Sequence, residues 1–116
     1  NLVFVRKLVE AGEDPSAIRL GVFSGHYRDE RDWSDEVLDA AKRRLAAWRE
    51  ALAQPGSMAG AEGVVAKLRA AIANDLDTPA ALAAVDEWAE ADRGTDEDGA
   101  ADLVRTALNS LLGVQA

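Results

Sequence analysis

The sequence predicts an all-α fold, a bundle of about five helices with a short strand remnant at its N-terminal end. Apolar residues recur every three or four positions along most of the chain, as they do on the buried face of a helix. Alanine, the best helix former, is abundant, and proline and glycine separate the periodic segments. The 116 residues suffice for one core without disulfides, and no cysteine is present to form them.

The longest periodic segment, 34–53, is the element around which the other helices are expected to pack. Ser34 is expected to cap its first turn, and Pro55-Gly56 is expected to follow its end. We expect Trp48 to be buried at the centre of the bundle. The apolar residues that share one face of this helix are Val37, Leu38, Ala41, Leu45, Trp48 and Leu52.

Two shorter elements come before it. Residues 1–5 are apolar and partly β-branched, which predicts the last piece of a strand, and a short helix then ends at Gly12. Asp14 and Pro15 are typical of the N-cap and first position of another helix. In that helix we expect the inward residues to be Ile18, Val22 and Phe23, with Leu20 near the edge of the apolar face.

Three further helices are predicted after residue 56. A flexible link over 54–63 is expected to lead to a helix over 63–73 that stops at Asn74. Thr78 and Pro79 then predict an N-cap and first helical position, with Leu76 packed back on the new helix. The inward residues of these two helices are expected to be Val64, Val65, Leu68, Ala71, Ile72, Leu82, Val85, Trp88 and Ala89.

The last helix is expected to begin at a weak capping box formed by Thr95 and Asp98 and to end at Gly113. Its apolar face would hold Leu103, Val104, Ala107, Leu108, Leu111 and Leu112.

The net charge of −8 argues against a free-standing nucleic-acid module, which needs a basic face to displace counterions from phosphates. The densest basic group is Lys42, Arg43, Arg44 and Arg49. We interpret this basic quartet as a solvated helix face, and the alternative is a local anion-binding surface.

The residues by themselves identify no catalytic, cofactor-binding or metal-binding site. Asp75 and Asp77 stand at a helix entry, where capping is the ordinary role and ligand binding the alternative. His26 with Ser24 nearby is interpreted as a packed ring or a dipole partner rather than a functional pair. The three tryptophans, Trp33, Trp48 and Trp88, are interpreted as packing residues, and a stacking platform is the alternative.

Several stretches in order nevertheless resemble one group of proteins. Residues 1–5 look like the segment after the KMSKS loop of class I aminoacyl-tRNA synthetases of the cysteinyl type. The runs 14–20, 24–28 and 32–34 are similar to the helix and loop that follow, and 74–82 is similar to a later helical domain. The resemblance covers nearly all of the chain.

Two families share that arrangement, cysteinyl-tRNA synthetase and its paralogue, the mycothiol-pathway ligase that joins cysteine to glucosaminyl-inositol. Leu76-Asp77, in place of an aromatic-Asn pair, and the run 85–89 look more like the ligase, as does the missing anticodon-binding segment. The resemblance implies a parent enzyme that uses ATP and zinc, with the catalytic motifs outside this chain. Because the sequence shows no signal peptide and no apolar run near 18 residues, we expect a cytoplasmic location. Residues 1–33 would then end the connection to the catalytic domain, and 34–116 would form the C-terminal bundle.

Three hypotheses follow from these patterns. The first is the C-terminal helical region of the mycothiol ligase, with its own N-terminal catalytic domain, cysteine and glucosaminyl-inositol as partners and no membrane. The second is the same region of a cysteinyl-tRNA synthetase, with tRNA as partner. The third is a non-enzymatic helical interaction module. No catalytic, cofactor or metal residue is assigned to this chain, which alone is expected to be inactive.

Overall fold

The structure, a computed structural model, describes residues 2–25 and 34–116. These residues form helices and no strand, which confirms the all-α prediction. The helices are α1 (Leu2–Glu10), α2 (Pro15–Phe23), α3 (Asp35–Ala53), α4 (Met58–Ala73), α5 (Thr78–Glu90) and α6 (Ala100–Ala107), and α6 continues as a π-helical segment, Leu108–Leu112. None of these helices is both long and apolar enough to cross a membrane.

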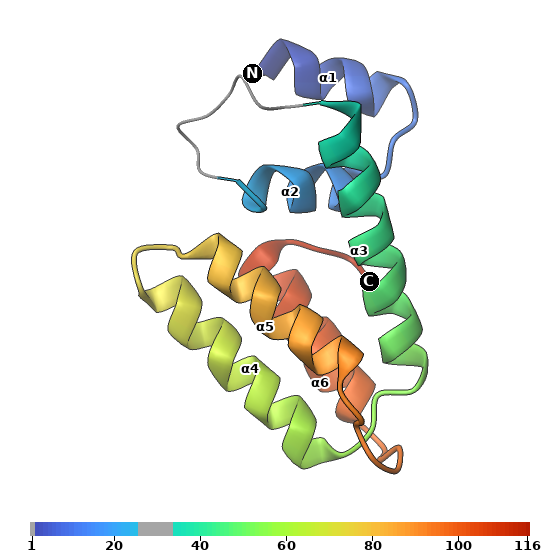
Figure 1. Ribbon diagram of the computed structural model, residues 1–116, viewed down its shortest axis with the longest axis vertical. Coiled ribbons are helices and arrows are strands. Elements are labelled where there is room, and N and C mark those ends of the chain that lie inside the picture. The colour runs from blue at the N-terminus through green and yellow to red at the C-terminus, as the bar shows by residue number, and fades with distance from the viewer. Residues whose placement is uncertain (1, 26–33) are drawn as a thin grey trace.

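Helix α3 connects the two ends of the molecule (Figure 1). Helices α1 and α2 lie at one end, where α2 packs against α3. Helix α4 packs against both α5 and α6, and α5 and α6 also contact α3. After the π-helical segment the chain returns to α3, beside which its last residue lies (Figure 1).

Trp48 lies in the core with none of its surface exposed, as predicted. Around it, α3 contributes Leu38, Ala41, Leu45 and Leu52, which are also buried. The other buried apolar side chains include Ile18, Leu20, Val64, Val65, Leu68, Leu82, Val85, Trp88, Val104, Leu108, Leu112 and Val114. Every helix from α2 onward therefore supplies part of one continuous core.

The predicted strand over residues 1–5 is wrong, because Leu2–Glu10 is helical. A strand needs a partner to accept its backbone hydrogen bonds, and the described residues supply no partner strand. A helix satisfies those groups within its own segment. Gly12 ends this region with φ at +84°, as its predicted stop role requires.

In α2 the N-cap and the inward position of Ile18 were predicted correctly, and the positions of Leu20 and Val22 were not. The Asp14 side chain accepts a hydrogen bond from the Ser16 N–H, and Pro15 begins the helix. Leu20, however, is completely buried, while Val22 is 39% exposed. The buried face is rotated toward Leu20 because α2 contacts α1, α3 and α5 together.

Helix α4 begins five residues earlier than the sequence predicted. Ser57 is its N-cap and accepts a hydrogen bond from the Gly60 N–H. The predicted flexible link over 54–63 is therefore wrong beyond Ser57, because Gly60 and Gly63 lie inside the helix. Glycine lowers helix propensity without forbidding a helix that is held by packing. Asn74 ends α4, as predicted.

The start of α5 differs from the prediction by one residue. Asp77, not Thr78, is the N-cap, and its carboxylate accepts a hydrogen bond from the Ala80 N–H at 3.1 Å. The Thr78 hydroxyl is buried and donates to the Phe23 carbonyl of α2 at 2.9 Å. Leu76 does not pack back on the helix, because it is 56% exposed.

Replacing Asp77 with alanine should lower the free energy of unfolding by about 1 kcal/mol, the usual cost of losing an N-cap. Asp77→Asn is the matched control, since asparagine caps about as well and should have little effect. Urea unfolding followed by circular dichroism measures both. An alanine variant as stable as the asparagine variant would contradict the assignment of the cap.

The predicted capping box of Thr95 and Asp98 is also wrong. Helix α6 begins after Gly99, which has φ at +88° and offers no side-chain cap. The acidic residues of this loop bind backbone N–H groups at the start of α4. Glu97 accepts a hydrogen bond from the Met58 N–H, and Asp96 accepts one from the N–H of Gly56, just before the helix. The loop therefore caps the N-terminus of another helix, where negative charge is favoured.

The C-terminal residues connect α2 and α3. Gly113, with φ at +66°, ends the helical run as predicted, and Val114 is fully buried. The Gln115 N–H donates to the Ser16 hydroxyl at 2.9 Å, and its carbonyl accepts from Arg49 at 3.0 Å. The tail is thus part of the packed structure.

Candidate functional site

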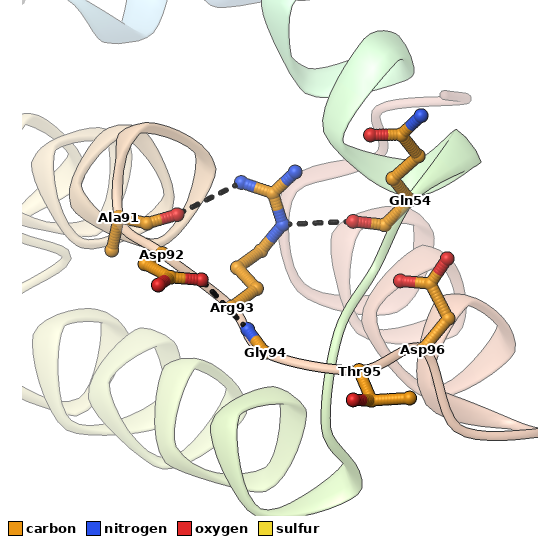
Figure 2. A pocket seen from close by; sticks show the side chains of 7 residues that line it. All are labelled: Gln54, Ala91, Asp92, Arg93, Gly94, Thr95 and Asp96. Carbon is orange, nitrogen blue, oxygen red and sulfur yellow. Dashed lines mark hydrogen bonds between the residues drawn. The ribbon is translucent and has the colours of Figure 1, made fainter.

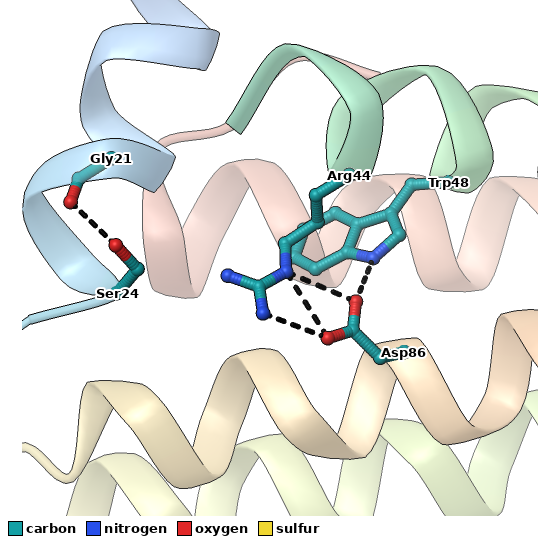
Figure 3. Close-up of polar contacts among 5 residues, drawn as sticks. All are labelled: Gly21, Ser24, Arg44, Trp48 and Asp86. Carbon is teal, nitrogen blue, oxygen red and sulfur yellow. Dashed lines mark hydrogen bonds and ion pairs between the residues drawn. The ribbon is translucent and has the colours of Figure 1, made fainter. Parts of the chain in front are cut away.

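A polar cluster lies between α3 and α5 (Figure 3). The indole N–H of Trp48 donates to Asp86 at 2.8 Å. Arg44, one turn before Trp48 on α3, holds both oxygens of the same carboxylate through its Nε at 3.2 and 3.1 Å and through Nη2 at 3.0 Å. Leaving a buried indole N–H without an acceptor costs free energy, and Asp86 avoids this cost at Trp48.

The cluster has the geometry of a structural link. Each oxygen of Asp86 already accepts from Arg44 or Trp48, and no further titratable group is bonded to it among the described residues. A general base needs an acceptor site open to its substrate. We therefore assign these three residues to holding α3 against α5.

The basic quartet, Lys42, Arg43, Arg44 and Arg49, is largely neutralised by acidic residues from other parts of the chain. Lys42 contacts Glu13 at 2.7 Å, Arg44 contacts Asp86 at 3.0 Å, and Arg49 contacts Asp14 at 3.0 Å. For Arg43 the described residues show no such ion pair. Phosphate binding by this surface would have to compete with three existing ion pairs, so the geometry does not favour the anion-binding alternative.

Two of these contacts shift the ionisation of their groups. The backbone N–H of Ser16, together with Arg49, lowers the pKa of Asp14 below its ordinary value. The hydrogen bond to Glu13 raises the pKa of Lys42. Both shifts favour the charged forms that make the ion pairs.

An open hollow of about 380 Å³ lies where the end of α3 meets the loop after α5 (Figure 2). Arg93 lies in it and donates to the Gln54 carbonyl at 2.9 Å and to the Ala91 carbonyl at 3.3 Å. It also donates to carbonyls of the last turn of α5, and its guanidinium lies 5.3 Å from the centre of the Trp88 ring. Arg93 thus serves as a C-terminal cap of α5, and the hollow presents no nucleophile and base in contact.

The remaining candidate residues do not form a site in the described structure. Asp75 is exposed and Asp77 is the cap of α5. In 2–25 and 34–116 no three His, Cys, Asp or Glu side chains are grouped to hold a metal ion. Ser24 donates to the Gly21 carbonyl at 2.7 Å, a local helix-end contact (Figure 3).

The structure describes two of the three tryptophans. Trp48 and Trp88 are buried, which excludes them as stacking platforms on the surface and confirms that they are packing residues. The Trp88 indole nitrogen is buried and has no hydrogen-bond partner within the described part of the chain. His26, Tyr27, Arg28 and Trp33 lie outside the described residues, so the predictions for them stay predictions.

Sequence reasoning missed Asp86 as the acceptor for the Trp48 N–H and Arg93 as the cation beside the Trp88 ring. The available signal was general and concerned Trp48 alone: a buried tryptophan N–H usually has an acceptor. It did not say which of the 21 acidic residues supplies it, because the choice depends on how α3 and α5 cross.

No protein-family model matches the chain. Curated relatives do match, and three of them carry the name L-cysteine:1D-myo-inositol 2-amino-2-deoxy-alpha-D-glucopyranoside ligase. The protein of Corynebacterium aurimucosum is 60% identical over 99% of this chain. Those of Saccharomonospora viridis and Mycolicibacterium smegmatis are 56% and 52% identical over 98% of it.

In each case the chain spans only 28% of the relative's length. The aligned region nevertheless includes nearly all of the helices described above. The chain is therefore homologous, along almost its entire length, to a segment of the L-cysteine:1D-myo-inositol 2-amino-2-deoxy-alpha-D-glucopyranoside ligases.

Proposed function

We propose that this chain is the C-terminal helical region of an ATP-dependent ligase of mycothiol biosynthesis, which works in the cytoplasm. In the whole enzyme the cysteine carboxylate attacks the α-phosphorus of ATP, which gives cysteinyl-adenylate and releases pyrophosphate. The amine of glucosaminyl-inositol then attacks the activated carbonyl, an amide bond forms and AMP leaves. The observation that carries this proposal is the 60% identity to a ligase of that name over 99% of the chain.

The region described here has a supporting role in this proposal. ATP and zinc are proposed to act in the part of the ligase outside the chain, as the resemblance to the cysteinyl type of class I synthetases implies. No catalytic step is assigned to any residue of the chain, which by itself should be inactive. Residues 1–33 are proposed as the end of the connection to the catalytic part, and 34–116 as the bundle.

The basic quartet gives no support to a tRNA acceptor. A tRNA-binding role would need lysine and arginine side chains available to phosphates. Three of the four candidates are instead paired with Glu13, Asp14 and Asp86. The basic quartet was the candidate tRNA-binding surface, so the cysteinyl-tRNA synthetase alternative gains no support from it.

A competition between acceptors tests the proposal. The full-length ligase is supplied with ATP, labelled cysteine, glucosaminyl-inositol and tRNA together, and the labelled product is identified by mass spectrometry. We expect the label in the cysteinyl amide of the amino sugar, and none when the amine is acetylated or ATP is omitted. Label on tRNA would overturn the proposal.

Arg43→Glu adds a specific control, because Arg43 is the member of the basic quartet for which the described residues show no ion pair. If the acceptor is the amino sugar, this charge reversal should leave kcat/KM unchanged within about twofold, since surface charges act mainly through long-range attraction of a charged ligand. A loss of tenfold or more would instead indicate a polyanionic acceptor on this face.

A further inference from the structure

Carbonyl oxygens and an aromatic ring hold the side chain of Arg93. Its Nη1 donates to the carbonyls of Trp88, Ala89 and Ala91. Its Nε donates to the Gln54 carbonyl at the end of α3, and Figure 2 shows the guanidinium between that carbonyl and the one of Ala91. The centre of the Trp88 ring lies 5.3 Å away. None of the ion pairs among the described residues includes Arg93, so neutral acceptors meet its positive charge.

These acceptors are available because α5 ends at this point. The last carbonyls of a helix have no N–H group one turn further along to bind them, and they form the negative end of the helix dipole. The face of an aromatic ring also attracts a cation. Asp92 and Asp96 line the same hollow and add negative charge (Figure 2). The hollow therefore offers the groups that bind a guanidinium or an ammonium ion.

The loop that carries Arg93, residues 91–99, also binds the start of α4. The Arg93 carbonyl accepts a hydrogen bond from the Ser57 N–H at 2.9 Å. The N–H groups on either side of Ser57 donate to two acidic side chains of the same loop. Ordering a loop costs conformational entropy, and a side chain fixed near its beginning lowers that cost for the residues that follow. The position of the guanidinium is thus coupled to the contacts between the loop and α4.

We infer that the hollow at the end of α5 is a receptor for a guanidinium or ammonium ion, that Arg93 fills it from within the chain, and that the filled receptor holds the 91–99 loop against α4. Removal of the side chain should empty the receptor and loosen the loop. A free guanidinium ion should then bind to the same carbonyls and the same ring and restore the loop. The inference concerns the fold of this loop and does not rest on the proposed function.

Hydrogen exchange in the full-length protein tests the inference at the N–H groups of residues 56–58, because the loop binds all three. In Arg93→Ala these groups should exchange about tenfold faster than in the wild type, since hydrogen bonds to a charged group are lost. Guanidinium chloride at about 20 mM is far below the molar range in which it unfolds proteins. It should restore at least half of the lost protection in Arg93→Ala and leave the wild type unchanged.

Sodium chloride at the same ionic strength is the control for screening and should restore nothing. Arg105→Ala is the matched control variant, because Arg105 lies on α6 and pairs with Asp102 there. Its exchange at residues 56–58 should match the wild type with and without guanidinium. Unchanged exchange in Arg93→Ala, no recovery with guanidinium, or equal recovery with both salts would overturn the inference.

Arg93→Lys and Arg93→Gln test the receptor without an empty hollow, which matters if the alanine variant does not fold. Both side chains can donate hydrogen bonds, but only lysine carries a positive charge. We expect residues 56–58 to exchange more slowly in the lysine variant than in the glutamine variant. Equal exchange in the two variants would show that the hollow does not select a cation, and the inference would be wrong.

Discussion

Trp48→Ala should lower the free energy of unfolding by roughly 3–5 kcal/mol, the range for removing a large aromatic side chain from a packed core. Trp48 has no exposed surface, so its removal leaves a cavity in the middle of the bundle. It also removes one of the donors that Asp86 binds. Urea unfolding followed by far-ultraviolet circular dichroism measures the change without relying on the lost fluorophore.

Trp48→Phe separates packing from the hydrogen bond. Phenylalanine retains much of the apolar contact but has no N–H, while Arg44 still binds the Asp86 carboxylate. The expected loss is therefore smaller, about 1–2 kcal/mol. If the alanine variant lost less than about 1 kcal/mol, Trp48 could not lie at the centre of the core.

The sequence predicted the order of helices and much of the core because those features repeat locally. The stripe on α3 contains Leu38, Leu45 and Trp48 at helical spacing, and all three are buried. Two caps in which a side chain bonds its own helix were predicted, at Asp14 and Ser34, whereas the equally local caps Ser57 and Asp77 were missed. Such contacts depend on neighbours within three residues.

Two of the errors occurred where a distant segment decides the local structure. Thr78 looked like a cap but bonds to α2, and Asp77 took the capping role. The acidic loop before α6 looked like a capping box, yet Glu97 caps α4. In both places the local pattern allowed two roles, and a contact across about 40 residues or more chose between them.

For function, too, local sequence patterns predicted some features, and contacts between distant segments determined others. Charge and composition alone left the basic quartet open as an anion-binding surface. The structure pairs Lys42, Arg44 and Arg49 with acids from α5 and the segment between α1 and α2, which no spacing rule along α3 could reveal. The order of the motifs, in contrast, indicated the family, because homologous segments keep their local sequence.

Gly56 packs against the loop between α5 and α6, the same loop that caps α4, and a substitution there should cause the second large loss of stability. This residue has φ at +78°, and a Cβ built on it would collide with the Cβ and the carbonyl oxygen of Arg93. The two segments are joined by the Ser57 N–H, which donates to the Arg93 carbonyl at 2.9 Å, and by the Glu97 N–H, which donates to the Gly56 carbonyl at 2.9 Å. Backbone atoms of the loop segment around Arg93 cannot move aside as a flexible side chain can.

Gly56→Ala should therefore lower the free energy of unfolding by roughly 2–5 kcal/mol, about 1–2 from left-handed backbone and about 1–3 from the forced displacement of the loop. Gly94→Ala is the matched control on the facing segment. Gly94 has φ at +76°, but nothing lies within 4 Å of its added Cβ, so it should show only the backbone part, about 1–2 kcal/mol. Equal losses at the two positions would mean that the segments around Gly56 and Arg93 are not in contact, and then neither Asp96 nor Glu97 could cap the start of α4.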